Sequence, residues 1–175
     1  MRITLENVNH SVTGFACSNG TVDTAINASF LPNAAKQIGI QKICINEETV
    51  GYHIFTIGTI SVNNIPNTDP NKCDFGSYGN KYAAFIVKYL AIGREHQGKE
   101  YGTKAMTAIL QFFLKFCSLL PIRYIAIEAL PECAAWYEEI GFLKTLAKTS
   151  EDCVIMYYDA IEEDRAKELK ERFSN

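Results

Sequence analysis

The residues HQGKEYG, at positions 96–102, have types and a spacing that suit an anion. They follow an apolar run and precede a long amphipathic stretch, so they form a loop that leaves a strand and opens a helix. The first N–H groups of a helix lack intrahelical partners, and the helix dipole adds positive potential there. Gly98 and Gly102 let the backbone approach a ligand, while Lys99 and Lys104 add charge. The spacing does not match a nucleotide P-loop or a Rossmann loop, and on its own it fits an anion site and an ordinary strand-to-helix turn equally well.

Glu100 is the unexpected residue of this loop, because a carboxylate repels a phosphate. It lies four residues before Lys104, which is the favoured orientation for a surface ion pair on a helix. An acid in the first turn also suits the helix dipole. We therefore expect the Glu100 side chain to point outward and its backbone N–H to stay available to an anion.

A buried strand and an amphipathic helix must hold this loop in place. Residues 81–92, KYAAFIVKYLAI, are apolar on both faces apart from the lysines, as in a strand at the centre of a covered sheet. From Lys104 to Ser118, polar residues recur every three or four positions in an apolar background, which predicts a mostly buried helix. Pro121 ends this helix, and IRYIAIEA forms a second two-faced strand. Strand, helix and strand make a βαβ unit, so we expect an α/β or α+β fold with a mixed sheet.

The remaining elements are shorter. A strand is expected near residues 2–6, and a weakly helical stretch over 22–38 that Pro32 breaks into two helices. QKICIN and VGYHIFTIGTISV read as a hairpin around the turn EET. LPECAAWYEEIGF reads as a short helix with Pro131 in its first turn and Gly141 as a left-handed stop. The polar segment 63–80 is a long loop, either functional or a plain excursion.

Composition limits the classes of function. The 175 residues fit one domain, residues 1–175, and the 47% hydrophobic and 21% charged shares are those of a globular protein. A net charge of -3 argues against general nucleic-acid binding. Residues 81–104 nevertheless hold five bases against two acids, and six bases could converge on one groove: Lys81, Lys88, Arg94, Lys99, Lys104 and Arg123.

Cysteine spacing and hydropathy give further expectations. The six cysteines are scattered, with no pair at metal-ligand spacing, so we expect free thiols and no metal site. The N-terminus has no signal-peptide core and no apolar run reaches a membrane span, which predicts a cytoplasmic protein without a membrane partner. The tail 159–175 is predicted to form a charged helix, which either docks on its own domain or pairs with a second copy in a homodimer.

The loop HQGKEYG followed by the helix end YEEIGF resembles two motifs of the GNAT (GCN5-related) N-acetyltransferase family, in the same order. Its pyrophosphate motif runs Arg or Gln, two residues, Gly, one residue, then Gly or Ala; Gln97 and Gly102 match the outer positions, and Glu100 stands where the first glycine belongs. Its last core helix usually closes as Y-E-x-x-G-F, which Tyr137, Gly141 and Phe142 match. The resemblance covers residues 81–145 well and the N-terminal half in element order only. It implies a single domain whose mixed, mostly antiparallel sheet has a splayed pair of parallel strands and helices on both faces.

The resemblance also implies a chemistry, namely acetyl transfer from acetyl-CoA to a primary amine. Tyr137 would act as the general acid that protonates the CoA thiolate, and the alternative is a core aromatic residue whose hydroxyl is hydrogen-bonded at a sheet edge. The backbone of the strand before the loop would pair with the pantetheine arm, and the loop amides would hold the pyrophosphate. The implied cofactor-binding residues are Leu90, Ala91, Ile92, Gln97, Gly98, Lys99, Glu100, Tyr101, Gly102 and Thr103.

No general base stands out. The four candidates are Glu95, Glu128, His96 and His53, of which Glu95 and His96 read most simply as solvated loop residues and His53 as a strand residue. Cys133 would suit a covalent mechanism, but no histidine is placed by sequence to activate it, so direct attack by the amine is the better interpretation.

The acceptor stays open among a small-molecule, peptide or protein amine. VGYHIFTIGTISV and FAC, at residues 15–17, resemble a subgroup that includes bacterial toxins acetylating aminoacyl-tRNA, which makes tRNA an alternative partner. A third alternative, motivated by Glu100, is a catalytically silent acyl-CoA-binding module.

Overall fold

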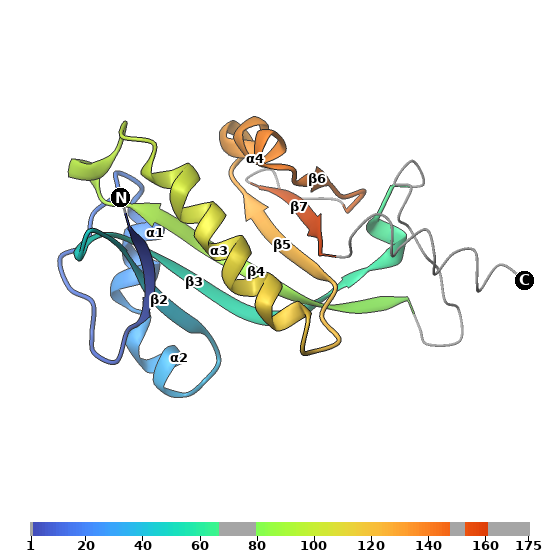
Figure 1. Ribbon diagram of the computed structural model, residues 1–175, viewed down its shortest axis with the longest axis horizontal. Coiled ribbons are helices and arrows are strands. Elements are labelled where there is room, and N and C mark those ends of the chain that lie inside the picture. The colour runs from blue at the N-terminus through green and yellow to red at the C-terminus, as the bar shows by residue number, and fades with distance from the viewer. Residues whose placement is uncertain (1, 67–79, 148–152, 161–175) are drawn as a thin grey trace, which may run out of the picture. The chain divides into compact units, whose positions relative to one another are not determined.

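The computed structural model describes residues 2–66, 80–147 and 153–160 (Figure 1). The described residues form two compact units, one within residues 1–57 and 86–115 and the other within residues 58–85 and 116–175. The helices and strands are β1 (Ile3–Asn7), α1 (Gly20–Asn27), α2 (Phe30–Ala34), β2 (Gly39–Ile45), β3 (Glu48–Ser61), β4 (Lys81–Ile92), α3 (Tyr101–Cys117), β5 (Tyr124–Ala129), α4 (Ala134–Ile140), β6 (Leu143–Lys144) and β7 (Val154–Asp159). Among the described residues, short 3-10 helices lie at Val62–Asn64, Arg94–His96 and Pro131–Cys133.

The strands form one seven-stranded sheet in the order β1-β2-β3-β4-β5-β7-β6. The sheet is mostly antiparallel, with one parallel pair, β4 and β5. Strands β3 and β4 are long enough to belong to both units. The predicted mixed sheet and its βαβ connection through α3 are therefore confirmed.

The β2–β3 hairpin turn begins one residue earlier than the sequence suggested and is one residue shorter. Its turn residues are Asn46 and Glu47, with φ of 49° and 73°, and β3 already starts at Glu48. Two consecutive positive φ values define the tight hairpin turn whose twist matches that of the strands it joins. Asn tolerates this region well, which accounts for the turn at Asn46 in place of the predicted EET.

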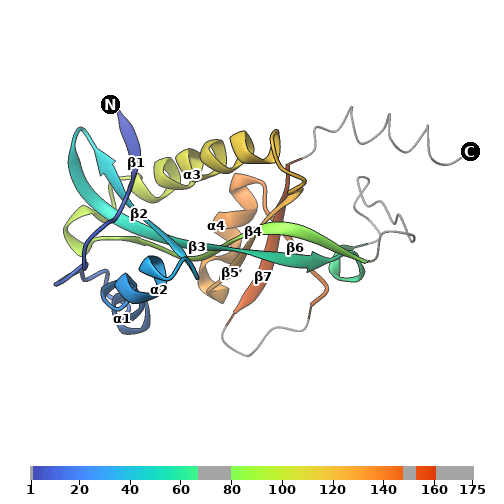
Figure 2. The ribbon, with the colours of Figure 1, turned by 90° about the horizontal axis from the view of Figure 1, so that it is seen from below.

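Within the first unit, helices cover both faces of the sheet (Figure 2). On one face, Ala105 of α3 packs against Ile43 and Val50. On the other face, Ile26 of α1 packs against Ile40 and Ile54. Ile40 and Ile43, three residues apart in β2, enter opposite cores, as the two-fold period of a strand requires. Val50 and Ile54 of β3 are four residues apart and still face opposite cores, because the pairing register shifts between Ile43 and Cys44 and leaves an extra residue in β3.

The helix boundaries differ from the prediction at Pro32. This residue lies inside α2, in its first turn, where a proline costs no hydrogen bond. The two short helices are separated instead at Ala28 and Ser29. Helix α1 begins after Asn19, whose side-chain oxygen accepts a hydrogen bond from the Val22 N–H at 3.2 Å.

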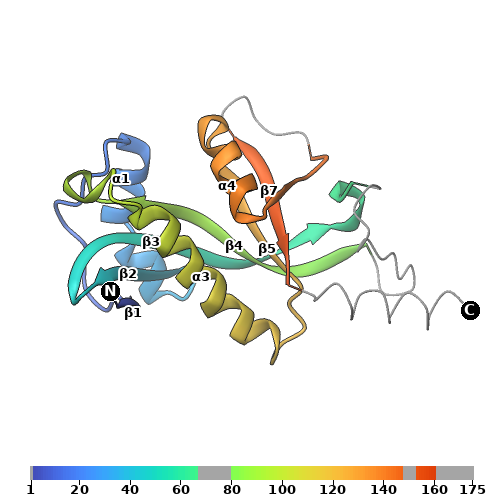
Figure 3. The same cartoon turned by 45° about the horizontal axis from the view of Figure 1, so that its top comes forward.

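In the second unit, α4 lies along β5 and β7 (Figures 1 and 3). Gly141 ends α4 with φ of 107°, the left-handed stop that the sequence predicted. Arg123 is buried between the rings of Tyr82 and Tyr124 and forms an ion pair of 2.7 Å with Asp159.

Some expectations fall wholly or partly outside the described residues. These are the charged tail, of which 161–175 is not described, and most of the predicted loop, of which 67–79 is not described. None of the helices in the described residues is both long and apolar enough to cross a membrane.

Candidate functional site

The β4–α3 loop has the backbone of a ligand-binding turn. After β4 ends at Ile92, a short 3-10 helix leads to two residues in the left-handed region, Gly98 at φ 73° and Glu100 at φ 58°. The space where a Gly98 side chain would stand is open, with nothing within 4 Å. Glu100 holds a conformation that costs an L-residue about 1–2 kcal/mol, which is a physical reason for glycine at this position in the GNAT motif.

The amides of this loop divide into two groups. Those of His96 and Gln97 bond back to the carbonyls of Gly93 and Arg94 at 2.8 and 3.4 Å. Those of Gly98, Lys99 and Glu100 donate to no described residue. Three adjacent donors at the start of a 17-residue helix form an arrangement that is chemically suited to an anion.

The Gln97 and Lys99 side chains brace the loop from within. The Gln97 amide donates to the carbonyls of Cys17 and Ile92 at 2.7 and 3.0 Å. The Lys99 ammonium donates to the Glu95 carbonyl at 3.0 Å. Gln97, a predicted cofactor contact, therefore fixes the loop to the end of β4 and to the N-terminal segment.

Glu100 points outward, as expected. Its carboxylate lies 3.6 Å from the Lys104 ammonium, and its side chain is 83% exposed. One detail differs, because α3 begins at Tyr101 and Glu100 precedes the first turn. Of the other predicted loop residues, Tyr101 and Gly102 are half-buried and Thr103 is exposed.

The N-terminal segment 15–18 acts as a strap across the loop, a feature the sequence did not reveal. The Arg94 N–H donates to the Ala16 carbonyl at 3.0 Å, and Arg94 Nε donates to Ser18 Oγ at 3.0 Å. On the α1 side, Asn27 accepts from the Phe15 N–H and donates to the Phe15 carbonyl at 3.2 and 3.0 Å. The strap therefore joins α1 to the loop through backbone groups.

The three predicted strand residues alternate between the two cores. Leu90 and Ile92 pack on the α3 side, and Ala91 is buried on the α1 side. Gly51 is required beside them, because a Cβ there would collide with the Ala91 carbonyl oxygen. Since these side chains serve the core, a ligand beside the end of β4 would be recognised by backbone groups.

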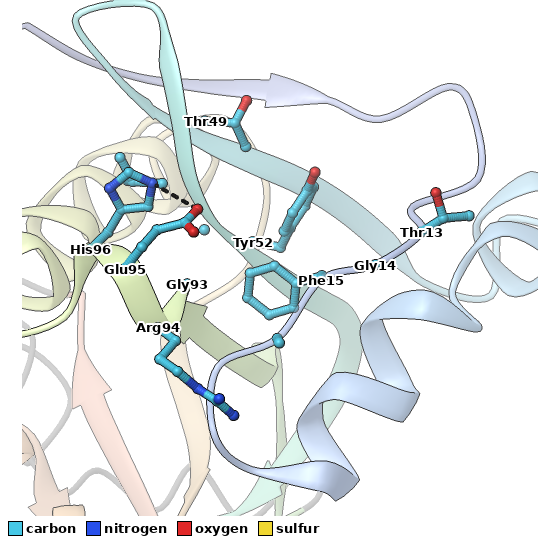
Figure 4. A pocket seen from close by; sticks show the side chains of 12 residues that line it. Thr13, Gly14, Phe15, Thr49, Tyr52, Gly93, Arg94, Glu95 and His96 are labelled. Carbon is cyan, nitrogen blue, oxygen red and sulfur yellow. Dashed lines mark ion pairs between the residues drawn. The ribbon is translucent and has the colours of Figure 1, made fainter.

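A pocket of about 360 Å³ opens next to the loop, entirely within the first unit (Figure 4). The rings of Phe15 and Tyr52 line it, 5.1 Å apart and edge to face. Glu95 and His96 form its rim, with 3.4 Å between Glu95 Oε1 and His96 Nε2. Glu95 is exposed as predicted, but His96 is 7% exposed, so its reading as a solvated loop residue was wrong.

His53 is excluded as a general base by its surroundings. It is fully buried, stacks on Phe55 and contacts the edge of Phe113. Its Nε2 hydrogen-bonds Gln41 Oε1 at 2.9 Å, and its Nδ1 has no partner among the described residues. Burial lowers the His53 pKa to about 3, so the ring stays neutral, in the β3 strand position that the sequence assigned.

Tyr137 belongs to the second unit, on α4. It is half-buried between Trp136 and Phe142, with ring centroids 4.6 and 5.7 Å away. Burial, followed by the nearby Cys133, raises the Tyr137 pKa well above its ordinary value. The phenol therefore carries its proton at neutral pH. Glu128, another candidate base, is exposed on β5 of the same unit.

The cysteines support neither a nucleophile nor a metal. Burial, followed by the charge of Glu132, raises the Cys133 pKa, so its thiol stays protonated. All five described cysteines are free: Cys17, Cys44, Cys117, Cys133 and Cys153. Within the described residues, no three His, Cys, Asp or Glu side chains gather into a metal-binding group.

No protein-family model matches the sequence, and no curated protein matches it either. Solved structures do match. They include a bacterial toxin (TM-score 0.75, 17% identity, 97% of this chain and 96% of that one) and AtaT in complex with acetyl-methionyl-tRNAfMet (0.73, 16%, 96% and 98%). A Y-to-F mutant of KacT matches as well (0.74, 14%, 97% and 99%). The chain thus has the fold of these GNAT-type toxins over nearly its whole length, as the resemblance of its motifs predicted.

Proposed function

We propose that this chain is an acetyl-CoA-dependent N-acetyltransferase. The observation that carries the proposal is the set of three backbone amides, Gly98 to Glu100, at the start of α3, which donate to no residue in the described part of the chain. A pyrophosphate needs such a cluster of N–H donors. A structure of AtaTR bound with AcCoA, with a TM-score of 0.70 to this chain, supports acetyl-CoA as the ligand.

Acetyl-CoA would be bound mainly by backbone groups. The amides from Gly98 to Thr103 would hold the pyrophosphate, and the backbone of Leu90 to Ile92 would pair with the pantetheine arm. The Glu100 carboxylate faces solvent and the Lys104 ammonium, so it lowers the local positive charge without occupying the cradle. We therefore expect a working cradle whose affinity the carboxylate tunes.

Tyr137 would supply the proton for the CoA thiolate after direct attack by the amine. Its raised pKa keeps it protonated at working pH, as a general acid requires. The same shift makes donation to a thiolate, whose conjugate acid lies near 8.5, less favourable. The transfer must therefore occur as the thiolate leaves. A protonated Cys133 thiol is a poor nucleophile, which favours direct attack over an acetyl-enzyme.

The test is thiol release when the protein is mixed with acetyl-CoA and a panel of amines. Replacing Tyr137 by Phe should lower the rate about 10²- to 10⁴-fold while leaving CoA affinity unchanged. Tyr158→Phe is the matched control, since Tyr158 is a half-buried tyrosine of the same unit. Unchanged turnover in Tyr137→Phe removes that residue from the mechanism, and no CoA binding at millimolar ligand by calorimetry removes the proposal itself. Binding without turnover supports the silent module.

Aminoacyl-tRNA is the second candidate acceptor, favoured by the AtaT complex with acetyl-methionyl-tRNAfMet. Of the six bases that could converge on a groove for tRNA, Arg123 does not take part, because it is buried and paired with Asp159. Lys104 is shared with Glu100. The test is acetylation of charged tRNA with a steep dependence on salt; salt-independent binding argues against this acceptor and leaves small-molecule, peptide and protein amines.

A further inference from the structure

Apolar side chains lie exposed where α3 ends. Phe116 is 38% exposed, Leu119 79% and Leu120 49%. The N–H groups of Leu119 and Leu120 both donate to the Phe116 carbonyl, at 3.0 and 2.8 Å, so a tight turn follows the helix. The Phe116 ring packs on Phe85, with ring centroids 6.0 Å apart. Phe116, Leu119 and Leu120 form a group that we call the apolar turn patch, and it lies wholly in the second unit.

The C-terminal end of β7 lies close to this patch. Strand β7 runs antiparallel to β5, and the Ala160 N–H that follows it donates to the Arg123 carbonyl at 2.9 Å (Figure 3). Arg123 comes three residues after Leu120, and the Ile122 N–H donates to the Leu120 carbonyl at 2.7 Å. The chain therefore continues from Ala160 beside the patch, and residues 161–175 follow.

The sequence of residues 161–175, IEEDRAKELKERFSN, predicts an amphipathic helix. Ile161, Leu169 and Phe173 are separated by multiples of four positions, so a helix would place them on one side. Two acid-to-base pairs at a spacing of four would support the helix: Glu163 with Lys167, and Glu168 with Arg172. A single helix of about 15 residues is marginal in water. Its apolar side therefore needs a surface on which to pack.

We propose that residues 161–175 dock as a helix on the apolar turn patch of their own chain. An exposed leucine that becomes buried contributes hydrophobic free energy, and both partners offer leucines. A segment tethered beside its site has an effective concentration in the millimolar range, which favours the chain's own tail over the tail of a second copy. The contact lies within the second unit and does not depend on the proposed acetyl transfer.

Trypsin can report this docking, because the tail carries four cleavage sites: Arg165, Lys167, Lys170 and Arg172. Cleavage of a docked segment follows its undocked fraction when docking is fast. The full chain should therefore be cut in the tail at least about tenfold more slowly than a free peptide of residues 161–175, as measured by mass spectrometry. Equal rates overturn the proposal. Protection should be the same at about 1 and about 100 µM protein. Protection that is lost on dilution overturns the proposal in favour of a second copy.

Variants on both sides of the contact locate it. Leu119→Asn should speed tail cleavage about fivefold, whereas Leu31→Asn, a control at a leucine that is 74% exposed in the first unit, should change it less than about twofold. In the tail, Leu169→Asn should speed cleavage about fivefold relative to a peptide with the same change, and Glu171→Gln, off the apolar side, less than about twofold.

The double variant completes the test. Leu119→Asn combined with Leu169→Asn should be cut no more than about twofold faster than either single variant, because the two changes remove the same contact. Effects that multiply overturn the pairing of these two leucines. Should Leu119→Asn fail to fold, Leu169→Asn still decides, since it lies beyond the last strand of the sheet. An unchanged cleavage rate in Leu169→Asn overturns the proposal, and thiol release from acetyl-CoA is tested separately.

Discussion

Replacing Glu100 by glycine separates backbone strain from charge in the β4–α3 loop. At φ 58° the glutamate sits in the left-handed region, which costs about 1–2 kcal/mol for an L-residue. Glycine removes that cost but adds about 0.5–1 kcal/mol of conformational entropy to the unfolded chain. Loss of the exposed Glu100–Lys104 pair removes about 0.3 kcal/mol. We therefore expect Glu100→Gly to raise the free energy of unfolding by about 0.5 kcal/mol.

Glu100→Ala is the matched control, because it removes the same carboxylate and keeps the Cβ. It should lower the free energy of unfolding by about 0.3 kcal/mol, so the two variants should differ by about 0.8 kcal/mol in urea titrations. Equal stability of the two would refute the strain argument. Both should bind CoA within about tenfold of the parent in calorimetry, since the carboxylate faces away from the cradle. Tightening by several orders of magnitude would show instead that the carboxylate faces the phosphate.

Three further changes test the packing described above. Gly51→Ala should lower the free energy of unfolding by about 1–3 kcal/mol in urea titrations, because the added methyl group collides with a β4 carbonyl. Gly20→Ala, its control in open space, should change it by less than about 0.5 kcal/mol. Asp159→Asn should cost about 3 kcal/mol because it removes the charged partner of a buried guanidinium, while Lys144→Met, which breaks an exposed pair of 2.8 Å, should cost under about 1 kcal/mol. His53 has a pKa of about 3 in the folded chain against 6.5 in the unfolded chain, so the unfolded chain takes up a proton first. The contribution of the neutral ring to the free energy of unfolding is therefore complete above pH 6.5 and is lost as the pH falls toward 3, by up to about 1.4 kcal/mol per pH unit. His53→Leu should flatten this pH dependence of stability, and an unaltered slope would contradict the neutral buried ring.

The elements that hold the loop could be predicted because their signals are local. The strand over 81–92, the buried helix after the loop and the left-handed stop at Gly141 follow from periodicity and from single residues with fixed conformational roles. The outward Glu100 followed from its spacing to Lys104.

The features that could not be predicted from the sequence depend on contacts between residues far apart in the chain. The residues next to His96 in the sequence do not indicate that the β2–β3 hairpin lies close to it and that its side chain is buried. Arg123 looked available to a nucleic acid because its partner Asp159 lies 36 residues away. The position of Pro32 inside α2 was missed for a different reason, because a proline fits a first helical turn as well as it breaks an interior one.

The strap has an evolutionary consequence. Arg94 and Gln97 donate hydrogen bonds to the strap, at the Ala16 and Cys17 carbonyls and the Ser18 hydroxyl. Among homologous chains, substitutions in the loop and in the segment before α1 should therefore be correlated, although some eighty positions separate them. A loop grafted alone into another GNAT-type scaffold would lose its shape, and the smallest transferable module is the loop together with its N-terminal strap.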